Sequence, residues 1–539
     1  MNSAGTAKAG RREWLGLAVL ALSALMLSVD ISVLFLALPQ LSADLEPSIT
    51  QQLWISDIYG FMLAGFLVTM GTLGDRIGRR RLLLIGAAAF GTASVVAAFS
   101  VNAPMLIVSR AILGIAGATL APSTLALISN MFRDEKQRGS AIAIWTSCFI
   151  GGIALGPVLG GVLLDTFWWG SAFLIGVPVM AVLLVVGPRV LPEFRDPNAG
   201  RLDLTSVALY LAAVLPAIYG FKEIARNGWQ PVPIATVGAG VAFGVLCVRR
   251  QWRLAYPLFD LRLFRNRTFR SVVTIFLLVG VVQSGAFLMV NLYLQLVEGL
   301  SPLQAGLRLL PAAFAMIAAT MAAPRIASRI RPASVMAASL VISAAGYLVI
   351  SRVPASMGVT ALMVGLAITN VGVGPIVALG YGLVLSAAPP EKAGSAASVN
   401  ETGGEFGVAL GIALLGSLGT AIYRFKMEDA IPAGVRADIA DAARESISGA
   451  VSAAAHVPGR IGADLLEAAH QAFTTALNTV AGISAIVFVG LAVLAAISLR
   501  ELRPVGESEA KDAQEAGGVP ASLSEIAVSS LEAHTQPSD

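Results

Sequence analysis

Charged residues are scarce in this sequence, and the scarcity excludes an ordinary soluble protein. Only 13% of the 539 residues are Asp, Glu, Lys or Arg, whereas 56% are hydrophobic. Soluble domains carry about 25% charged residues. The mean hydropathy is +0.77. The composition therefore predicts an integral membrane protein.

Cysteine is also nearly absent, and no Gly-Lys dipeptide occurs. The two cysteines, Cys148 and Cys247, lie in apolar runs and predict no disulfide framework. A phosphate-binding loop requires the Gly-Lys pair, so this sequence predicts no such loop for ATP. We expect no metal and no other cofactor, and any transport must therefore draw on an ion gradient. The basic pI of 9.2 does not indicate nucleic-acid binding, because the basic residues lie in short loops between apolar segments.

Long apolar runs, in contrast, are abundant, and about fourteen of them approach the length that a membrane-spanning helix needs, roughly 20 residues. The first is too long for a signal-peptide core and lacks an Ala-x-Ala exit, so we interpret it as a span. The predicted spans lie near 14–38, 52–74, 82–100, 103–129, 139–164, 170–190, 204–222, 232–250, 271–297, 303–325, 333–351, 357–386, 392–424 and 473–499.

Basic residues in the short loops predict the orientation of the chain. Loops with several arginines, at 76–81, 133–138, 249–270 and 325–331, alternate with loops that carry almost no positive charge. Because the number of spans is even, we expect both termini in the cytoplasm, on the same side as the arginine-rich loops.

A glycine pattern in the fifth span recurs in the thirteenth, eight spans later. In each span glycine occupies every fourth position over three turns: Gly152, Gly156 and Gly160, then Gly403, Gly407 and Gly411. The repeat predicts two related halves with two helices inserted between them. Paired halves with a binding site near the bilayer midplane are typical of secondary transporters.

The predicted fold is therefore all-α and integral to the membrane, with 14 transmembrane helices. Its membrane part divides into an N-terminal six-helix half (14–190), two inserted helices (204–250) and a C-terminal six-helix half (271–499). The other segments are a basic N-terminal segment at 1–13, an external loop at 425–472 within the second half that reads as two amphipathic helices broken at Pro458-Gly459, and a cytoplasmic tail at 503–539 whose composition predicts disorder.

The segment 71–81, GTLGDRIGRRR, follows the second span. Positive-inside anchoring with a glycine turn explains its arginines but does not require Asp75. The segment is similar to the signature loop of the major facilitator superfamily. That resemblance implies a cytoplasmic latch in which Asp75 pairs with loop arginines or a helix N-terminus in one state, and Arg133 and Arg138 are candidate partners. The latch residues are Asp75, Arg76, Arg79 and Arg80.

Two more motifs lie in the first half. Arg110 interrupts the apolar run LIVSRAILGIAG of the fourth span, where it could snorkel from a helix end, but its position places it below the external surface. It resembles the superfamily's buried span-four arginine, which implies that it tunes the charge state of an acid. The fifth span reads GIALGPVLGG; such glycines can serve ordinary helix packing and the proline bends the helix. With Gly-Pro and Gly-Gly together, it resembles the antiporter motif, which implies export. The motif residues are Gly152, Gly156, Pro157, Gly160 and Gly161.

Two aspartates fall within predicted spans of the first half. Asp30 lies well inside the first span, where an acid costs roughly 2.5–3.5 kcal/mol; it could instead be a satisfied polar contact to Arg110. Asp57 lies near the outer end of the second span, where it could be a solvated residue. Both stretches, SVDISVLFLALP and QLWISDIY, resemble those of drug/proton antiporters with fourteen spans, except that Ser32 replaces the usual threonine.

Two glutamates, Glu401 and Glu405, lie in SVNETGGEFGVALG of the thirteenth span. If the helix begins near Pro390, they lie about 14 Å and 20 Å along it, near the midplane, and on one face. Two carboxylates this close in a low dielectric cannot both ionise easily, so a proton bound there can exchange for a cation. The pattern NETGGEFG resembles the quaternary-ammonium and multidrug branch of the antiporters. A solvated or purely structural pair is the alternative.

A pocket for lipophilic cations should be apolar and aromatic. Each candidate side chain could equally serve packing. The candidates are Met26, Trp54, Tyr59, Trp145, Phe149, Gln283, Phe287, Asn291 and Tyr293.

These features together predict a monomeric transporter of the fourteen-span drug/proton antiporter type, not an enzyme. It would export lipophilic cations such as quaternary ammonium compounds, dyes and biocides in exchange for protons, by alternating access. It would bind protons, small molecules and the lipid bilayer, and neither nucleic acid nor ATP. One alternative is an exporter or importer dedicated to one metabolite or antibiotic on the same fold. The other is a membrane sensor or enzyme without transport.

Overall fold

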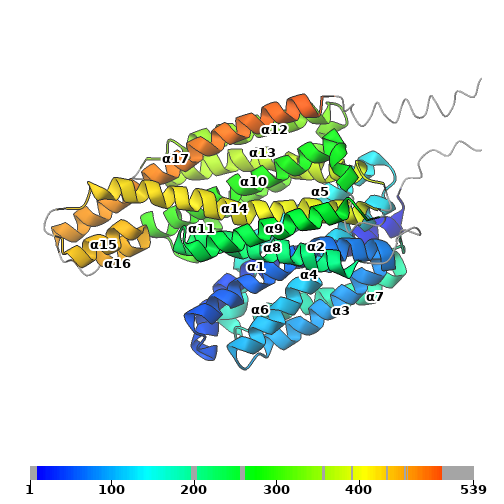
Figure 1. The fold of residues 1–539 in the computed structure, drawn as a ribbon, viewed down its shortest axis with the longest axis horizontal. Coiled ribbons are helices and arrows are strands. Elements are labelled where there is room, and N and C mark those ends of the chain that lie inside the picture. Colours follow the sequence, from blue (N-terminus) through cyan, green and yellow to red (C-terminus); the bar gives the residue numbers. More distant parts are fainter. Residues whose placement is uncertain are drawn as a thin grey trace, which may run out of the picture.

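A computed structural model of the chain describes residues 9–195, 203–254, 261–354, 358–389, 392–432, 435–454, 457 and 459–500. Within these ranges the secondary structure is entirely helical, and fourteen helices are long and apolar enough to cross a membrane. They run roughly side by side along the long axis of the molecule (Figure 1). The predicted all-α fold with 14 spans is thus confirmed.

The helix bounds agree with the predicted spans, most of which are extended by several residues. The helices are α1 (Arg11–Leu45), α2 (Ile49–Ile77), α3 (Arg79–Ala98), α4 (Ala103–Met131), α5 (Glu135–Thr166), α6 (Ser171–Leu174), α7 (Gly176–Val190), α8 (Leu204–Asn227), α9 (Pro231–Gln251), η1 (Leu261–Arg265), α10 (Arg267–Leu292), η2 (Tyr293–Val297), α11 (Pro302–Ala327), α12 (Pro332–Ile350), α13 (Val359–Ser386), α14 (Ala393–Glu428), α15 (Ala437–Glu445), α16 (Ile447–Ala454) and α17 (Arg460–Ser498).

The same packing pattern occurs twice in the bundle. In the first half α1 packs on α5, α2 on α4, and α3 on α4 and α7. In the second half α10 packs on α14, α11 on α13, and α12 on α13 and α17, which are the equivalent pairs eight spans later. The recurrence supports the proposal of two six-helix halves. The inserted helices α8 and α9 pack on each other, and α8 also contacts α2 and α14.

The repeated glycines allow the closest of these contacts. A Cβ at Gly152 of α5 would collide with the carbonyl of Leu25 on α1, and a Cβ at Gly411 of α14 would collide with the carbonyl of Val281 on α10. Small residues let helix backbones approach to this distance. The glycine pattern read from the sequence therefore marks equivalent helix pairs in the two halves.

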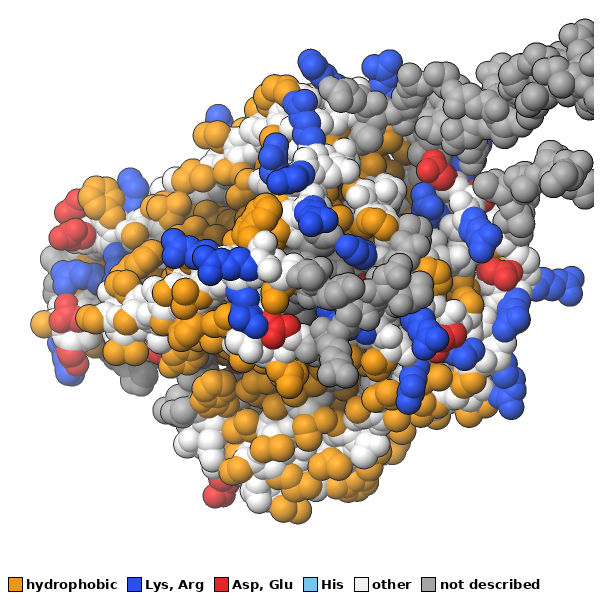
Figure 2. Space-filling view, turned by 45° about the vertical axis from the view of Figure 1, so that its right-hand side comes forward, with side chains coloured by type: hydrophobic (Ala, Val, Ile, Leu, Met, Phe, Trp, Pro, Cys, Tyr) orange, Lys and Arg blue, Asp and Glu red, His pale blue; other side chains and the backbone are white. Residues whose placement is uncertain are grey.

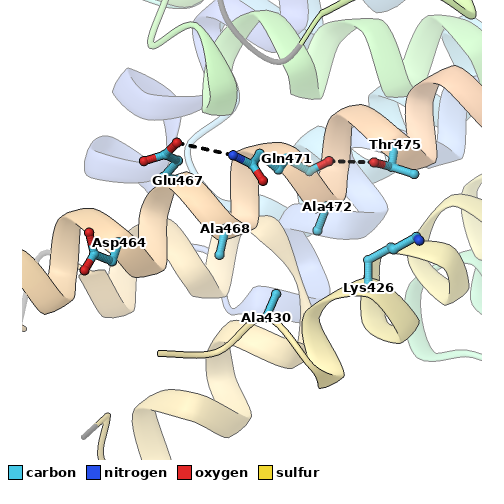
Figure 3. Close-up of a pocket in the computed structure, with 8 residues that line it drawn as sticks. All are labelled: Lys426, Ala430, Asp464, Glu467, Ala468, Gln471, Ala472 and Thr475. Carbon is cyan, nitrogen blue, oxygen red and sulfur yellow. Dashed lines mark hydrogen bonds between the residues drawn. The ribbon is translucent and has the colours of Figure 1, made fainter. Parts of the chain in front are cut away.

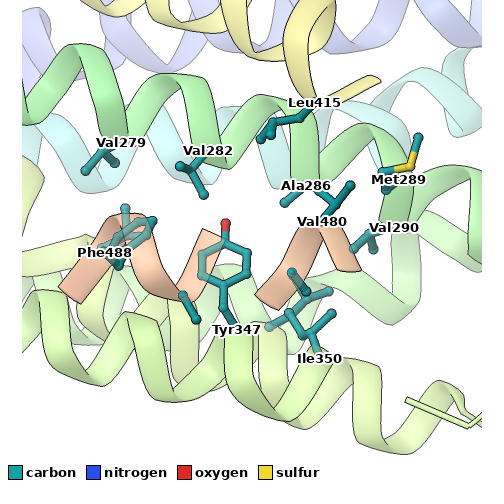
Figure 4. Packing of buried hydrophobic residues seen from close by; sticks show 14 of the residues in the cluster. Val279, Val282, Ala286, Met289, Val290, Tyr347, Ile350, Leu415, Val480 and Phe488 are labelled. Carbon is teal, nitrogen blue, oxygen red and sulfur yellow. The ribbon is translucent and has the colours of Figure 1, made fainter. Parts of the chain in front are cut away.

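Each half has its own apolar core. In the second half the Tyr347 ring lies among aliphatic side chains of α10, with the Phe488 ring 5.3 Å away (Figure 4). The Tyr347 hydroxyl donates a hydrogen bond of 2.6 Å to Gln283, which satisfies its polar end inside the core. The core of the first half also includes Leu385, Ala393 and Ala397 from α13 and α14, where the two parts of the bundle pack on each other.

The two ends of the bundle differ. One end, here called the arginine-rich end, carries the start of α1, the α2–α3 connection, the start of α14 and the end of α17 (Figure 1). The other end carries α15 and α16. Figure 2 shows Lys and Arg side chains gathered away from the broad hydrophobic surface that covers the middle of the helices. A hydrophobic middle between polar ends fits a lipid environment.

The long loop of the second half contains helices, but not in the predicted arrangement of one helix on each side of Pro458-Gly459: two short helices precede this point, and the residues after it begin the last span. α15 and α16 are two short helices, and the Tyr423 hydroxyl of α14 donates to the Ala443 carbonyl of α15 at 2.9 Å. The last span begins at Arg460 rather than near 473, because the polar turns before it continue the same helix. A pocket of about 390 Å³ lies between the end of α14 and the start of α17 and is lined partly by Lys426 and Glu467 (Figure 3).

Some predictions fall outside the described residues. They concern 1–8 of the N-terminal segment, the predicted helix start at Pro390, the break at Pro458 and the tail at 503–539. In the described part, α14 begins at Ala393 with Lys392 as its N-cap residue.

Candidate functional site

Asp75 joins the two halves at the arginine-rich end. Its Oδ1 accepts from Arg79 Nε at 2.9 Å and pairs with Arg79 Nη2 at 2.9 Å. Its Oδ2 accepts from the backbone N–H of Ser395, in the first turn of α14, at 3.1 Å. Helix N-termini bind carboxylates through such unpaired N–H groups. Asp75 thus makes both kinds of contact expected of it, one to an arginine and one to a helix N-terminus.

The backbones of α2 and α14 approach closely beside this contact. A Cβ at Gly394 would lie 2.5 Å from Asp75 Oδ1, and a Cβ at Gly71 would lie 2.8 Å from the Gly394 carbonyl. The two glycines therefore make room for the carboxylate and for the crossing of the helices. The halves are in contact at this end of the bundle.

The other charged residues near the latch have different partners. Arg80 pairs with Glu193 at 3.6 Å, and Arg76 is half-buried in the last turn of α2. Arg138, one of two expected partners of Asp75, pairs instead with Glu135 at 3.4 Å. The arginine that pairs with Asp75 is Arg79, which follows Asp75 by one helical turn and is fully buried beside it.

Asp30 and Arg110 are buried together in the first half. Arg110 is 1% exposed; its Nε donates to the Ile55 carbonyl at 2.6 Å, and its guanidinium lies 5.4 Å from the centre of the Tyr59 ring. Asp30 is 7% exposed, interacts electrostatically with Arg110, and has one carboxyl oxygen, Oδ2, without a hydrogen-bond partner. An unsatisfied buried carboxyl oxygen is costly, and the interaction with Arg110 leaves this oxygen of Asp30 without a hydrogen bond.

Asp57 meets a lysine from the inserted helices. Lys222 of α8 donates to Asp57 Oδ1 at 3.0 Å. The same ammonium lies 4.8 Å from the centre of the Phe61 ring. Trp54, one turn before Asp57, stacks on Tyr219 of α8 at 6.3 Å. Asp57 is therefore a paired acid beside aromatic rings and not a solvated helix end.

Glu401 has a phenol partner. The Tyr381 hydroxyl of α13 donates to Glu401 Oε1 at 2.5 Å. The Tyr381 ring meets the Trp145 ring edge to face at 5.8 Å, and Trp145 stacks on Phe149 at 6.0 Å. The Trp145 indole donates to Thr124 at 3.1 Å. Tyr381, Trp145 and Phe149 are here called the aromatic row. Through this row a carboxyl group of the second half is linked to aromatic rings of the first half.

Glu405 completes the cluster. It is half-buried on α14 one turn after Glu401, and the two carboxyl groups repel each other electrostatically. It also interacts electrostatically with Lys222. Glu405 and Asp30 both interact electrostatically with the buried Tyr59, so the two acids lie near the same side chain. The four acids predicted from three separate stretches of sequence therefore belong to one electrostatic group.

This group, here called the acid cluster, consists of four carboxyl groups and two basic side chains: Asp30, Asp57, Glu401, Glu405, Arg110 and Lys222. Fully ionised, it holds two more negative than positive charges. In a low-dielectric interior such an excess favours binding of protons or of an added cation.

The pocket candidates separate into two groups. Met26, Tyr59 and Trp145 are buried; the Tyr59 ring lies against Arg110 of the acid cluster, and Trp145 meets Tyr381. Gln283 is instead tied to Tyr347 and donates to Asn370 at 3.1 Å within the second half.

The remaining candidates of the second half are not joined to the acids by any described contact. Asn291 donates to the backbone carbonyl of Phe287, whose ring is 53% exposed, and the Tyr293 hydroxyl donates to Glu298 at 2.9 Å. In the antiporter motif Gly152 packs on α1 and Gly156 and Gly160 are buried. Pro157 and Gly161 lie within α5, but their surroundings are outside the described residues.

Sequence reasoning missed two members of the site. The sequence did contain a signal for Lys222, because a lysine in an apolar run is an intramembrane charge. As the last residue of the predicted span 204–222, however, it looked like an ordinary helix end. Tyr381 has no such signal, since it is a single tyrosine in the apolar run VALGYGLVLS. Only the crossing of α13 and α14 brings it to Glu401.

Known proteins resemble this chain over most of its length. The family described as the Major Facilitator Superfamily matches residues 20–412. The chain is 41% identical over 495 residues to the multidrug efflux pump LfrA of Mycolicibacterium smegmatis, covering 92% of this chain and 98% of that protein. It is 33% identical to the methyl viologen resistance protein SmvA of Salmonella typhimurium, with 83% and 90% covered. It is 30% identical to the tetracenomycin C resistance and export protein of Streptomyces glaucescens, with 89% and 91% covered.

Solved structures share the fold at low sequence identity. A human organic anion transporter matches with a TM-score of 0.58 and 15% identity, covering 88% of this chain and 99% of that one. A bacterial homologue of the human lysosomal transporter Spinster matches with a TM-score of 0.54 and 16% identity, covering 91% and 98%. At this identity the likeness extends to the fold alone.

Proposed function

This chain belongs to the Major Facilitator Superfamily, and on that premise we propose that it is a proton-coupled multidrug efflux antiporter for lipophilic cations. It is a multi-pass membrane transporter of small molecules and not an enzyme. Its relatives are efflux and resistance proteins; one is a multidrug efflux pump, and another confers resistance to methyl viologen, which is an organic dication.

The excess of carboxyl groups in the acid cluster carries the proposal. Arg110 and Lys222 can balance only two of the four acids. Protons balance the other two when no substrate is bound, and an organic cation takes their place when it binds. Exchange of one for the other is antiport, because the same carboxyl groups cannot hold both charges at once.

The aromatic row supplies affinity for organic cations. Tyr381 contacts Glu401, and the rings of Trp145 and Phe149 follow one another from Tyr381. A cation over an aromatic face gains about 0.5–2 kcal/mol, and more when it leaves water. A site made of ring faces and a carboxylate selects charge and apolar surface rather than one particular shape, which suits many substrates.

The contacts of Asp75 control which side of the transporter is open. Asp75 ties α2 to the N-terminus of α14, so its contacts are made only when the halves meet at the arginine-rich end. We infer that this end is cytoplasmic, from the positive charge of its loops, and that the structure is closed to the cytoplasm. Protons then reach Glu401, Glu405 and Asp30 from outside, and substrate that enters from the cytoplasm after the latch opens releases them.

The test is ethidium efflux from energised cells or everted vesicles that carry the protein with Glu405→Gln. Glutamine keeps the size of the side chain but cannot exchange a proton, so we expect active efflux to fall at least tenfold. Efflux by the unmodified protein should collapse when a protonophore removes the gradient. Glu428→Gln, at the exposed end of the same helix, is the matched control and should pump normally.

Normal proton-driven pumping by Glu405→Gln would refute the proton site. Efflux confined to a single compound across a drug panel would instead support the dedicated exporter, which the tetracenomycin C relative also represents. Proteoliposomes that show no flux under a pH gradient would leave only a membrane protein without transport.

A further inference from the structure

Lys222 is the one residue by which the inserted helices enter the acid cluster, as far as the described contacts show. It lies near the end of α8, and its side chain is 26% exposed, while the Asp57 side chain that it contacts is 15% exposed. A lysine that only anchored a helix end would extend its ammonium into water. Lys222 instead directs it to a carboxylate on a neighbouring helix.

The surroundings of this ammonium are those of a binding site for an organic cation. The Nζ atom lies 3.0 Å from Asp57 Oδ1 and 4.8 Å from the centre of the Phe61 ring. Trp54 lies 6.0 Å from Phe61 and stacks on Tyr219 at 6.3 Å. One carboxylate and several aromatic rings are the groups that bind ammonium ligands.

The same charge also acts on the transport site. Lys222 interacts electrostatically with Glu405, so it lies within reach of two carboxyl groups, Asp57 and Glu405. A substrate with one positive charge needs only one of these acids. A substrate with two positive charges gains from both, and a fixed positive charge between them opposes it.

We propose that Lys222 is a tethered cation that fills a second cation-binding site, formed by Asp57, Trp54, Phe61 and Tyr219, and thereby makes the pump favour monovalent over divalent organic cations. The inference rests on the proposed function as an exporter of cations. It assigns a role to the inserted helix pair, which brings the specificity-determining residue to the side of the transport site.

The test compares two cations of different charge in the same membranes. Ethidium carries one positive charge and methyl viologen carries two. In Lys222→Gln we expect the ratio of methyl viologen efflux to ethidium efflux to rise about fivefold, because Asp57 and the rings become available to the second charge. Lys222→Arg keeps the charge and should keep the ratio within twofold.

Two controls separate this effect from a structural one. Lys426→Gln removes an exposed lysine at the far end of α14 and should leave both rates unchanged. In the double variant Lys222→Gln with Asp57→Asn the gain in the ratio should disappear, because the acid that receives the second charge is gone. Equal loss of both activities in Lys222→Gln, or a gain that survives in the double variant, overturns the proposal.

The unmodified protein gives an independent measurement if the variants do not accumulate. Tetraphenylphosphonium, a monovalent cation, should compete with ethidium efflux at a concentration several-fold lower than methyl viologen. Equal or better competition by the divalent cation overturns the inference while ethidium efflux that depends on Glu405 leaves the proposed function intact. If the unmodified protein exports neither cation, the proposed function and this inference both fail.

Discussion

The chain buries acidic groups in two regions, and they differ in how completely those groups are satisfied. Asp75 at the arginine-rich end has one oxygen on Arg79 and the other on the N-terminus of α14. Asp30 in the middle of the bundle has an oxygen with no hydrogen-bond partner. A fully satisfied carboxylate stabilises one arrangement of the helices. We expect the charge of an incompletely satisfied carboxylate to be balanced by a proton or a cation that binds and dissociates.

The largest effect should follow from neutralising the unsatisfied acid. In Asp30→Asn we expect concentrative efflux to fall about a hundredfold, because asparagine cannot take up a proton and leaves Arg110 without its acid. Exchange of substrate across vesicles without a proton gradient should fall much less. Efflux and gradient-free exchange of ethidium, measured on the same vesicles, distinguish these outcomes; equal loss of both would indicate that Asp30 only holds the fold.

Neutralising the satisfied acid should act on the rate of alternation instead. In Asp75→Asn we expect efflux to fall about tenfold or more, while the affinity for ethidium, measured by fluorescence on purified protein, stays within twofold. The physical reason is the loss of the charged contacts to Arg79 and to the helix N-terminus, neither of which involves a residue of the aromatic row.

A second variant at the latch changes its geometry without removing charge. Gly394→Ala places a methyl group against the Asp75 carboxylate, so it should slow efflux in the same way, by a few-fold. If either latch variant weakened ethidium binding more than it slowed efflux, the distinction between the two regions would be wrong.

Removing the hydroxyl of Tyr381 should have a smaller effect on the site. In Tyr381→Phe we expect the ethidium concentration for half-maximal transport to rise about threefold with little change in maximal rate. The ring still meets Trp145, whereas Glu401 loses a hydrogen bond worth about 0.5–1.5 kcal/mol. Transport kinetics in proteoliposomes would check the split, and Tyr347→Phe, which removes a buried hydroxyl bonded to Gln283 and not to Glu401, is the matched control.

The smallest effect should come from an acid outside the membrane spans. Arg250 and Ser206 hydrogen-bond the Asp203 carboxylate and hold its pKa at about 2, below the ordinary value of 3.8. The folded state thus favours the ionised form, so its stabilising contribution is present above pH 3.8 and is lost as the pH falls towards 2. Because the pair is near the surface, Asp203→Asn should cost about 1 kcal/mol or less at pH 7.

Thermal unfolding in detergent would measure this last change, with a shift of about one degree or less at pH 7 that shrinks as the pH approaches 2. A large fall in transport from Asp203→Asn would contradict the assignment of this acid to stability alone.

The fold was predictable from the sequence because the spans are set by long apolar runs, and their pairing was marked by glycines. Gly152 and Gly411 could be assigned to equivalent helices before any coordinates, since only close helix packing requires glycine every fourth residue. Helix ends were less predictable. α17 begins thirteen positions before the predicted start near 473, because an amphipathic stretch continues the helix beyond its apolar part.

Site residues could be predicted where the residue type itself is unusual in its sequence context. They could not be predicted where their role depends on how helices cross. An acid inside an apolar run, such as Asp30, is visible in the sequence. The link from Glu401 to Trp145 passes through Tyr381, and it depends on how three helices meet. Asp75 shows the intermediate case. The sequence predicted the type of its partner but not which arginine would pair with it in this state of the protein, where Arg79 does and Arg138 pairs with Glu135.

α14 carries 36 residues without a proline, whereas α4, α11 and α13 each contain proline within the helix. At 1.5 Å per residue it is a rod of about 54 Å, well beyond the thickness of the bilayer core. One end receives Asp75, both glutamates lie along it, and its far end is tied to α15 through Tyr423. Movement at one end of a continuous helix is passed to its other end. We therefore expect that a protein that binds α15 and α16 and holds them in place would restrain the latch at the opposite end without entering the transport path.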